Sequence, residues 1–140
     1  MLVTTHTLVA STIAIKTGNP YLYLPFAAVD HFVLDTFPHF DAPWVRKNYY
    51  KMAAIDAFFG ITIFLVLARY TKFSVLILFA VCLLAGWPDL VTLFKKLTGI
   101  KSKKVTKFIN FHEDIQRLEF PAGIFIEIVI VVGCLLLIFL

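Results

Sequence analysis

One uninterrupted apolar run, FSVLILFAVCLLAGWPDLVTLF at residues 73–94, is long enough to cross a membrane as a helix, which takes about 20 residues. It contains one acid, Asp89, and no basic residue. The rest of the chain is similarly apolar: hydrophobic residues make up 60% of the 140, and the mean hydropathy is +0.86. These values exceed the apolar share of a soluble domain and predict a single integral membrane domain over residues 1–140.

Turn signals divide the chain into four to five membrane-associated helices. Gly18 and Pro20 end a first short apolar segment, and Pro38 stops the second. Because both segments are shorter than a typical span, we expect a hairpin that crosses only with tilt or enters partway. The 73–94 helix is expected to break near its end, at residues 86–89. The sequence predicts an all-α polytopic membrane helical bundle with helices at about 2–15, 20–37, 43–69, 73–94 and 121–140, and a short amphipathic helix at about 104–119.

The basic residues are divided unevenly between the two ends of this bundle. Three lie on the side opposite the N-terminus: Lys16, Arg69 and Lys72. Ten lie on the side that holds the N-terminus: Arg46, Lys47, Lys51, Lys95, Lys96, Lys101, Lys103, Lys104, Lys107 and Arg117. Because cytoplasmic loops carry the excess of Lys and Arg, we predict a cytoplasmic N-terminus and an external C-terminus. The net charge of +4 is thus a topology signal and does not indicate nucleic-acid binding.

All four histidines and all nine acids map to the N-terminal side of the predicted bundle. Ionisable groups at membrane depth are costly, so they are read by default as functional. His31 and Asp35 are four residues apart and share a helix face, where imidazole and carboxylate can hold an ion such as Zn²⁺. The predicted metal ligands are His6, His31, Asp35, His39, Asp89 and His112.

Each candidate ligand also has a purely structural interpretation. His31 and Asp35 could satisfy one another in the bundle interior. Asp89 follows a proline and could cap the next turn, and His6 alone would usually be a satisfied core histidine.

Two further acids are the predicted catalytic residues. Asp56 lies among small residues that let another helix approach closely, and we interpret it as a bridging ligand or general base. Its structural alternative is a buried carboxylate that hydrogen-bonds a Ser, Thr or Tyr of a neighbouring helix. Glu127 is the single acid of the last span. Its position leaves three roles open: a metal ligand, a proton acceptor, or an ion-pair partner of Lys107 or Arg117. Asp41 is expected to cap a helix.

The order of three short motifs resembles a known family. They are Thr5-His6, Pro88-Asp89 (with the segment 38–41 as a competing match) and Phe111-His112. In this order they resemble the small bacterial and archaeal inner-membrane proteins described as YdjM-like membrane-bound metal-dependent hydrolases, which are similar in motif order to zinc-dependent phospholipase C and P1 nuclease. The family's usual His-Arg-Gly and His-Ser signature is absent from this chain. The resemblance implies a metal-dependent phosphoester hydrolase in the cytoplasmic membrane of a prokaryote.

The expected function is hydrolysis of a phosphoester in a lipid or membrane-proximal substrate. A divalent metal, with zinc as the first choice, would activate a water at the cytoplasmic side. The expected partners are membrane lipids and an anionic lipid or phosphoester substrate held by the basic loop. No nucleic-acid partner is expected. The sequence is compatible with a homo-oligomer. The alternatives are a non-enzymatic metal-binding or ion- or proton-handling membrane protein, and a small structural subunit of a membrane complex.

Overall fold

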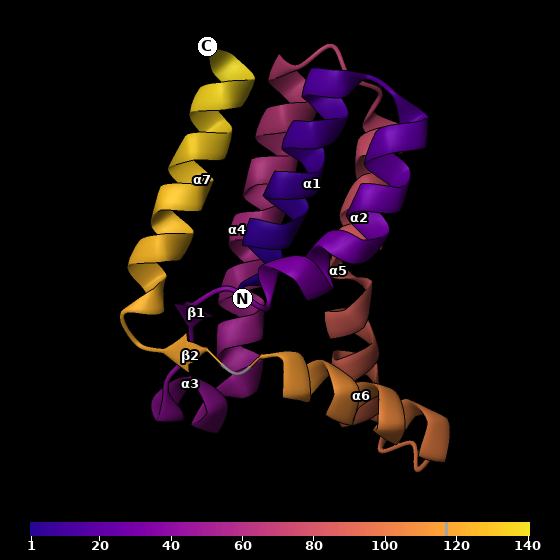
Figure 1. Ribbon diagram of the computed structural model, residues 1–140, viewed down its shortest axis with the longest axis vertical. Coiled ribbons are helices and arrows are strands. Elements are labelled where there is room, and N and C mark those ends of the chain that lie inside the picture. The colour runs from indigo at the N-terminus through magenta and orange to yellow at the C-terminus, as the bar shows by residue number, and fades with distance from the viewer. Residues whose placement is uncertain (117) are drawn as a thin grey trace.

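The computed structural model describes residues 1–116 and 118–140, with Glu119 described by its backbone. Helices dominate these residues, which confirms the all-α prediction (Figure 1). In chain order the elements are α1 (Val3–Thr17), α2 (Pro20–Leu34), β1 (His39–Phe40), α3 (Pro43–Lys47), α4 (Tyr49–Tyr70), α5 (Val75–Thr98), α6 (Lys103–Ile115), β2 (Glu119–Phe120) and α7 (Gly123–Phe139).

Helix α1 is the central element of the bundle. It packs against α2, α4, α5 and α7, which surround it (Figure 1). Many of its buried positions are small or hydroxylated, including Ala10, Ser11, Thr12 and Ala14. Small side chains let neighbouring backbones approach closely, so a short and rather polar helix can occupy the middle of the fold.

Helices α1 and α2 form the expected hairpin. Gly18 ends α1 with a φ of 59°, a left-handed conformation that glycine adopts without the clash of a Cβ atom. Pro20 then occupies the first turn of α2, where Asn19 accepts a hydrogen bond from Tyr21 N at 3.0 Å. Because α1 has 15 residues against 22 in α4, its N-terminus lies partway along the bundle rather than at its end (Figure 1).

Helix α5 extends beyond residue 94, where the sequence predicts its end, and does not break at residues 86–89. The helix continues through Pro88 to Thr98 and stops at Gly99, which has a φ of 68°. A proline disturbs the hydrogen bonds of the turn before it without always breaking a helix, provided that tertiary contacts hold the two halves. Ala85, one turn before Pro88, accepts a hydrogen bond from the ring of His31 through its carbonyl oxygen.

Other predicted boundaries also need correction. The helix expected at 43–69 is two helices, α3 and α4, which meet at Asn48, a residue with non-helical angles of φ −110° and ψ 33°. Helix α2 ends at Leu34 rather than at residue 37, with Asp35 as its C-cap. The amphipathic helix ends at Ile115 rather than at residue 119.

A short parallel pairing joins two distant loops at the base of α7. His39 pairs with Glu119 and Phe40 with Phe120. Gly123 opens α7 directly against this pairing: a Cβ atom there would lie 2.1 Å from the carbonyl carbon and oxygen of His39. Only glycine allows this approach, which brings the loop after α2 into contact with α7.

Two helices, α4 and α5, are long and apolar enough to cross a membrane, and α7 is a shorter apolar helix. Their apolar side chains largely face outward, for example Phe58, Leu65, Leu76 and Phe125, which are 60–77% exposed. The bundle therefore has an apolar outer surface and a polar interior around the start of α1, the reverse of a soluble domain.

Candidate metal centre

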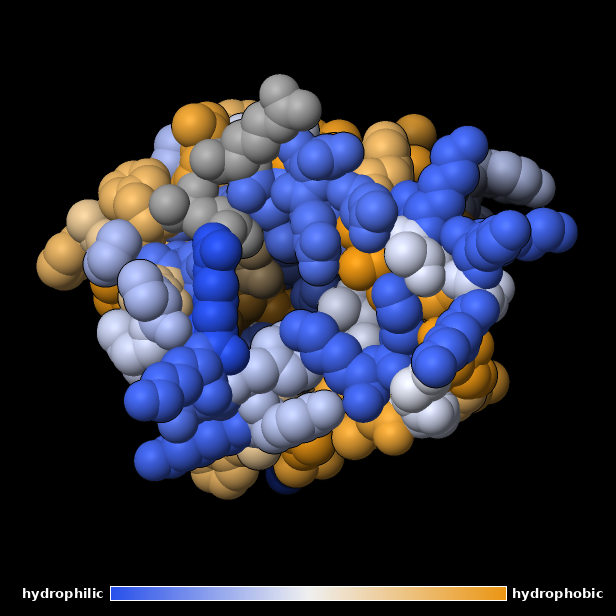
Figure 2. Space-filling model, turned by 90° about the horizontal axis from the view of Figure 1, so that it is seen from below, coloured by the Kyte–Doolittle hydropathy of each residue, from blue (hydrophilic) through white to orange (hydrophobic). Residues whose placement is uncertain are grey.

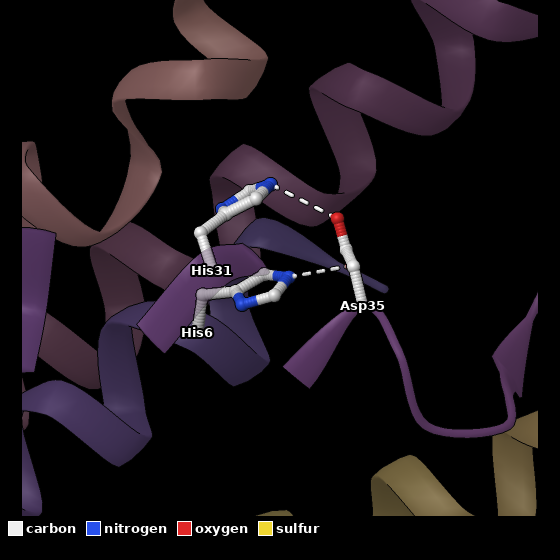
Figure 3. A group of neighbouring side chains, drawn as sticks. All are labelled: His6, His31 and Asp35. Carbon is white, nitrogen blue, oxygen red and sulfur yellow. Dashed lines mark ion pairs between the residues drawn. The ribbon is translucent and has the colours of Figure 1, made fainter. Parts of the chain in front are cut away.

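Histidines and acids from four helices meet inside the bundle. His6 comes from the second turn of α1, His31 and Asp35 from the end of α2, Asp89 from α5 and His112 from the last turn of α6. Two groups could hold a metal ion: His6, His31 and Asp35, all buried, and His31, Asp89 and His112. Figure 3 shows the first, with both imidazole rings beside the Asp35 carboxylate.

Three ligand atoms form a compact triangle at the centre of the site. His31 Nε2 lies 3.0 Å from His112 Nε2 and 3.3 Å from Asp35 Oδ2, and His112 Nε2 lies 3.0 Å from the same oxygen. All three side chains are almost completely buried. Zinc bonds of about 2.0–2.1 Å in a tetrahedral site place neighbouring ligand atoms about 3.3 Å apart. The separations in the triangle match that spacing.

The tautomer of His31 suits a ligand. Its Nδ1 lies 2.9 Å from the carbonyl oxygen of Ala85, which can only accept, so Nδ1 carries the proton. In the neutral ring, Nε2 therefore presents its lone pair to His112 and Asp35. Metal-bound histidines usually donate their other ring N–H to a carbonyl or carboxylate in this way.

Asp89 stands at the edge of the triangle. Its Oδ2 is 3.6 Å from His31 Nε2, and its side chain is 26% exposed, whereas that of His31 is fully buried. The Asp89 carboxylate thus lies between the buried ligands and the solvent-accessible side of the site. Together, His31, His112, Asp35 and Asp89 offer two nitrogens and two carboxylates, a donor set that suits zinc.

His6 adds a further buried imidazole on the other side of Asp35. Its ring stacks on that of His31 with 3.8 Å between centroids, and its Nε2 lies 3.2 Å from Asp35 Oδ1. Neither ring nitrogen of His6 has a partner with hydrogen-bond geometry in the described part of the chain. The amine of Met1 also lies 2.9 Å from Asp35 Oδ1. Because an unsatisfied buried polar atom is costly, the His6 nitrogen that carries the lone pair fits a site that takes a cation.

Two residues near the centre were missing from the predicted site. Gln116 Nε2 donates to Asp35 Oδ2 at 2.8 Å and lies 3.4 Å from His112 Nε2. The signal for Gln116 was its position one helical turn after His112. Asp30, beside His31, is completely buried, and neither of its carboxylate oxygens has a hydrogen-bond partner in residues 1–116 and 118–140. Asp30 belongs to neither ligand group.

The two predicted catalytic acids contact the N-terminus of α1. Asp56 accepts hydrogen bonds from Val3 N at 2.8 Å and Thr4 N at 3.1 Å. Glu127 accepts from Leu2 N at 3.0 Å, from the Thr5 hydroxyl at 2.8 Å and from Phe40 N at 2.9 Å.

These contacts satisfy amides at the first turn of α1, which have no partner within the helix, and place negative charge at the positive end of its dipole. For Asp56, the carboxylate contacts a neighbouring helix as in the structural alternative, but its donors are backbone amides instead of a Ser, Thr or Tyr side chain. Neither acid belongs to a ligand group. Of the partners considered for Glu127, Arg117 lies outside the described residues.

His39 and Asp41 lie on the loop after α2. His39 is buried with its Nδ1 2.8 Å from the carbonyl oxygen of Phe37, and it belongs to neither ligand group. Its strand pairing carries it toward α7 rather than back onto His31. Asp41 pairs with Arg46 instead of capping α3, whose N-cap is Ala42.

A cavity of about 580 Å³ opens beside the ligands, and Asp89, His112 and Gln116 form one part of its wall. Val45, Met52, Leu90 and Leu93 make much of its lining apolar; the cations Arg46 and Lys96 also line it. The Lys96 ammonium lies 3.4 Å from the centre of the Tyr49 ring. This cavity lies toward the end of the molecule that carries α3 and α6, a face covered largely by hydrophilic side chains (Figure 2).

The chain matches no protein-family model, no curated protein and no solved structure, so the interpretation of this centre depends on its own geometry and chemistry.

Proposed function

We propose that the chain is a membrane-embedded metal-dependent hydrolase whose centre is built by His31, Asp35 and His112, with His6 beside them and Asp89 at the edge as the general base. One observation carries this proposal: three ligand atoms from α2 and α6 lie 3.0–3.3 Å apart in a buried site. Without a cation, the lone pair of His31 Nε2 would face a carboxylate oxygen directly. Zinc is the proposed ion because two imidazoles and carboxylates are its usual ligands.

A divalent ion at this centre would supply a water whose pKa is lowered to about 7, the nucleophile of many hydrolytic sites. The chain's own residues account for the remaining requirements. The backbone of Ala85 orients His31, and Gln116 holds Asp35. Asp89 is partly exposed at the wall of the cavity, where its carboxylate is placed to accept a proton from a water. Asp56 and Glu127 act as positioning residues that fix α1 and, with it, His6.

The cavity indicates the class of substrate. Four acids line the cavity, Asp41, Asp56, Asp89 and Glu113, together with the cations Arg46 and Lys96. Lys96 offers a positive charge to an anionic group, and the apolar side chains of Met52, Leu90 and Leu93 offer a surface for a hydrocarbon part. An amphiphilic anion combines both features. We therefore propose a phosphoester in a lipid or membrane-proximal substrate, in agreement with the resemblance to YdjM-like hydrolases.

The membrane placement is part of the same proposal. Four to five membrane-associated helices would cross or enter a cytoplasmic membrane of a prokaryote, with the N-terminus cytoplasmic and the C-terminus outside. The outward apolar side chains of α4, α5 and α7 and the ten-to-three division of basic residues support it. Arg117, one of the ten, lies outside the described residues.

The test is hydrolysis by zinc-loaded protein in mild detergent. Release of p-nitrophenol is measured for p-nitrophenyl phosphate and its bis-ester, and release of phosphate is measured for phosphatidic acid. We expect turnover of at least one, faster with the lipid substrate, and a loss of about 100-fold or more in Asp89→Asn, the usual scale for a general base. Asp114→Asn is the matched control, since Asp114 lies on α6 outside both ligand groups and the cavity wall. Equal rates in all three proteins would refute the proposal.

A second candidate function is non-enzymatic metal binding. One observation favours it. The two acids predicted to be catalytic, Asp56 and Glu127, accept hydrogen bonds from backbone amides at the start of α1. Stoichiometric zinc without turnover of any phosphoester would select this function.

A further inference from the structure

A second cavity, of about 620 Å³, lies between the end of α5 and helix α6. Lys95, Gly99 and Ile100 line it from the α5 side, Lys101 lines it from the connecting loop, and Lys103, Thr106, Lys107 and Asn110 line it from α6. None of these residues lines the cavity beside the metal centre. The basic loop that the sequence analysis assigned to lipid or substrate thus lines a cavity of its own.

The charge of this cavity has one sign. Four of its eight lining residues are lysines, and none of the acids whose side chains the structure describes lines it. Lys95 donates to the hydroxyl of Thr106 at 3.2 Å, which ties α5 to α6 across the cavity. Lys103 and Lys107 are one helical turn apart and share a face of α6. Four lysines that line one open volume give it a positive charge, which suits an anion with several oxygens such as a phosphate.

Apolar side chains are exposed on the last turns of α5, which lead to this cavity. Ile100 lines it and is 41% exposed; Phe94 and Leu97, on the last turns of α5, are 57% and 67% exposed. Helix α6 lies across the end of the bundle, at a steep angle to α4 and α5 (Figure 1). An amphipathic helix in this orientation lies along the interface when α5 crosses a membrane. A small soluble anion would contact only the lysines. A lipid would also contact the exposed apolar residues, because its acyl chains would lie along α5.

We propose that this cavity binds the phosphate headgroup of an anionic phospholipid. The site is distinct from the metal centre and does not depend on its chemistry, although it rests on the proposed membrane placement of α5. The lysines neutralise the headgroup, and the acyl chains lie against the exposed apolar residues of α5. The lipid would thereby fix α6, which carries His112.

The test is binding of short-chain phosphatidylglycerol to the full chain in mild detergent, followed by native mass spectrometry. Phosphatidylcholine and inorganic phosphate are titrated in parallel. The test variant is Lys103→Gln/Lys107→Gln. Its matched control, Lys104→Gln/Lys51→Gln, removes the same charge from α6 and α4 but touches no lining residue of the cavity.

We expect phosphatidylglycerol to bind better than both other ligands. Its affinity should be about 25-fold weaker in the test variant, because each of the two lysines contributes roughly fivefold near a charged headgroup. The control variant should stay within about twofold of the wild type. Metal content should be the same in all proteins, which separates a failure here from a failure of the metal centre.

Three results would overturn the proposal: equal weakening in both double variants, equal binding of phosphatidylcholine, or equally tight binding of inorganic phosphate alone. If the α6 variant loses helix content by circular dichroism, Lys101→Gln replaces it, because Lys101 lies in the loop before α6. That variant should weaken phosphatidylglycerol binding about fivefold, and an unchanged affinity would equally overturn the proposal.

Discussion

Asp35, the residue that caps α2, and His112, on the last turn of α6, meet at 3.0 Å between Oδ2 and Nε2 although 77 positions separate them in the chain. The contact crosses from the central bundle to the helix that lies over its end (Figure 1). Gln116, one turn later, binds the same oxygen. The position of α6 therefore depends on the candidate metal centre.

Metal removal should loosen this connection. Chelation of the purified protein is expected to lower its thermal unfolding midpoint, and added Zn²⁺ should restore it, because an ion that binds only the folded state stabilises it by about 2.7 kcal/mol at 100 times its Kd. Differential scanning fluorimetry in detergent measures the change. Asp35→Ala should show no response to zinc, and a response equal to that of the wild type would argue against Asp35 as a ligand.

Removal of the Asp56 carboxylate should destabilise the fold without emptying the metal centre. In Asp56→Ala the amides of Val3 and Thr4 lose their acceptor inside the bundle. We expect a loss of about 1–3 kcal/mol, the usual penalty for buried donors left without partners. Chemical unfolding and elemental analysis on the same sample measure both quantities. Asp41→Ala, which breaks a pair with the exposed Arg46, is the control and should cost less than about 1 kcal/mol. Metal loss in Asp56→Ala would support its prediction as a bridging ligand.

Two glycines of α7 should respond in opposite ways to alanine. Gly123→Ala would place a methyl group 2.1 Å from the backbone of His39, so we expect the fold to lose about 3 kcal/mol or more. Gly133→Ala meets no atom within 4 Å and should be neutral or stabilise the helix by up to about 1 kcal/mol. Thermal unfolding of both variants decides the question. Equal stability changes in the two variants would contradict the close contact between Gly123 of α7 and His39 in the loop after α2.

His39 and His31 should differ in their effect on bound metal. His31→Ala removes a corner of the ligand triangle, whereas His39 belongs to neither ligand group. We expect His39→Ala to retain the metal content of the wild type and His31→Ala to lose it. Loss of metal in both variants at equal helix content would restore His39 to the ligand set that the sequence predicted.

Local spacing explains why part of the centre could be predicted from sequence. His31 and Asp35 share a helix face because they are four residues apart, and His112 and Gln116 repeat that spacing on α6. A helix period fixes these relations whatever the rest of the chain does. The same is true of the apolar spans and of the hairpin at Gly18 and Pro20.

Tertiary packing explains the differences. The sequence does not show that α1 begins inside the bundle, and only that position brings its first amides to Asp56 and Glu127. The passage of α5 through Pro88 likewise depends on its neighbours, since a proline alone favours a break. His39 is among the ligands that the sequence predicts, but its pairing with β2 carries it to α7.

The most direct test of the central claim is the metal content of protein purified in mild detergent without a metal-affinity resin, measured by elemental analysis. Wild type, His112→Ala and His39→Ala are compared at equal helix content. The metal centre predicts about one or more equivalents of zinc, or of another divalent ion, in wild type and His39→Ala, and near zero in His112→Ala. Wild type that carries no metal and takes up none when ions are added would contradict it.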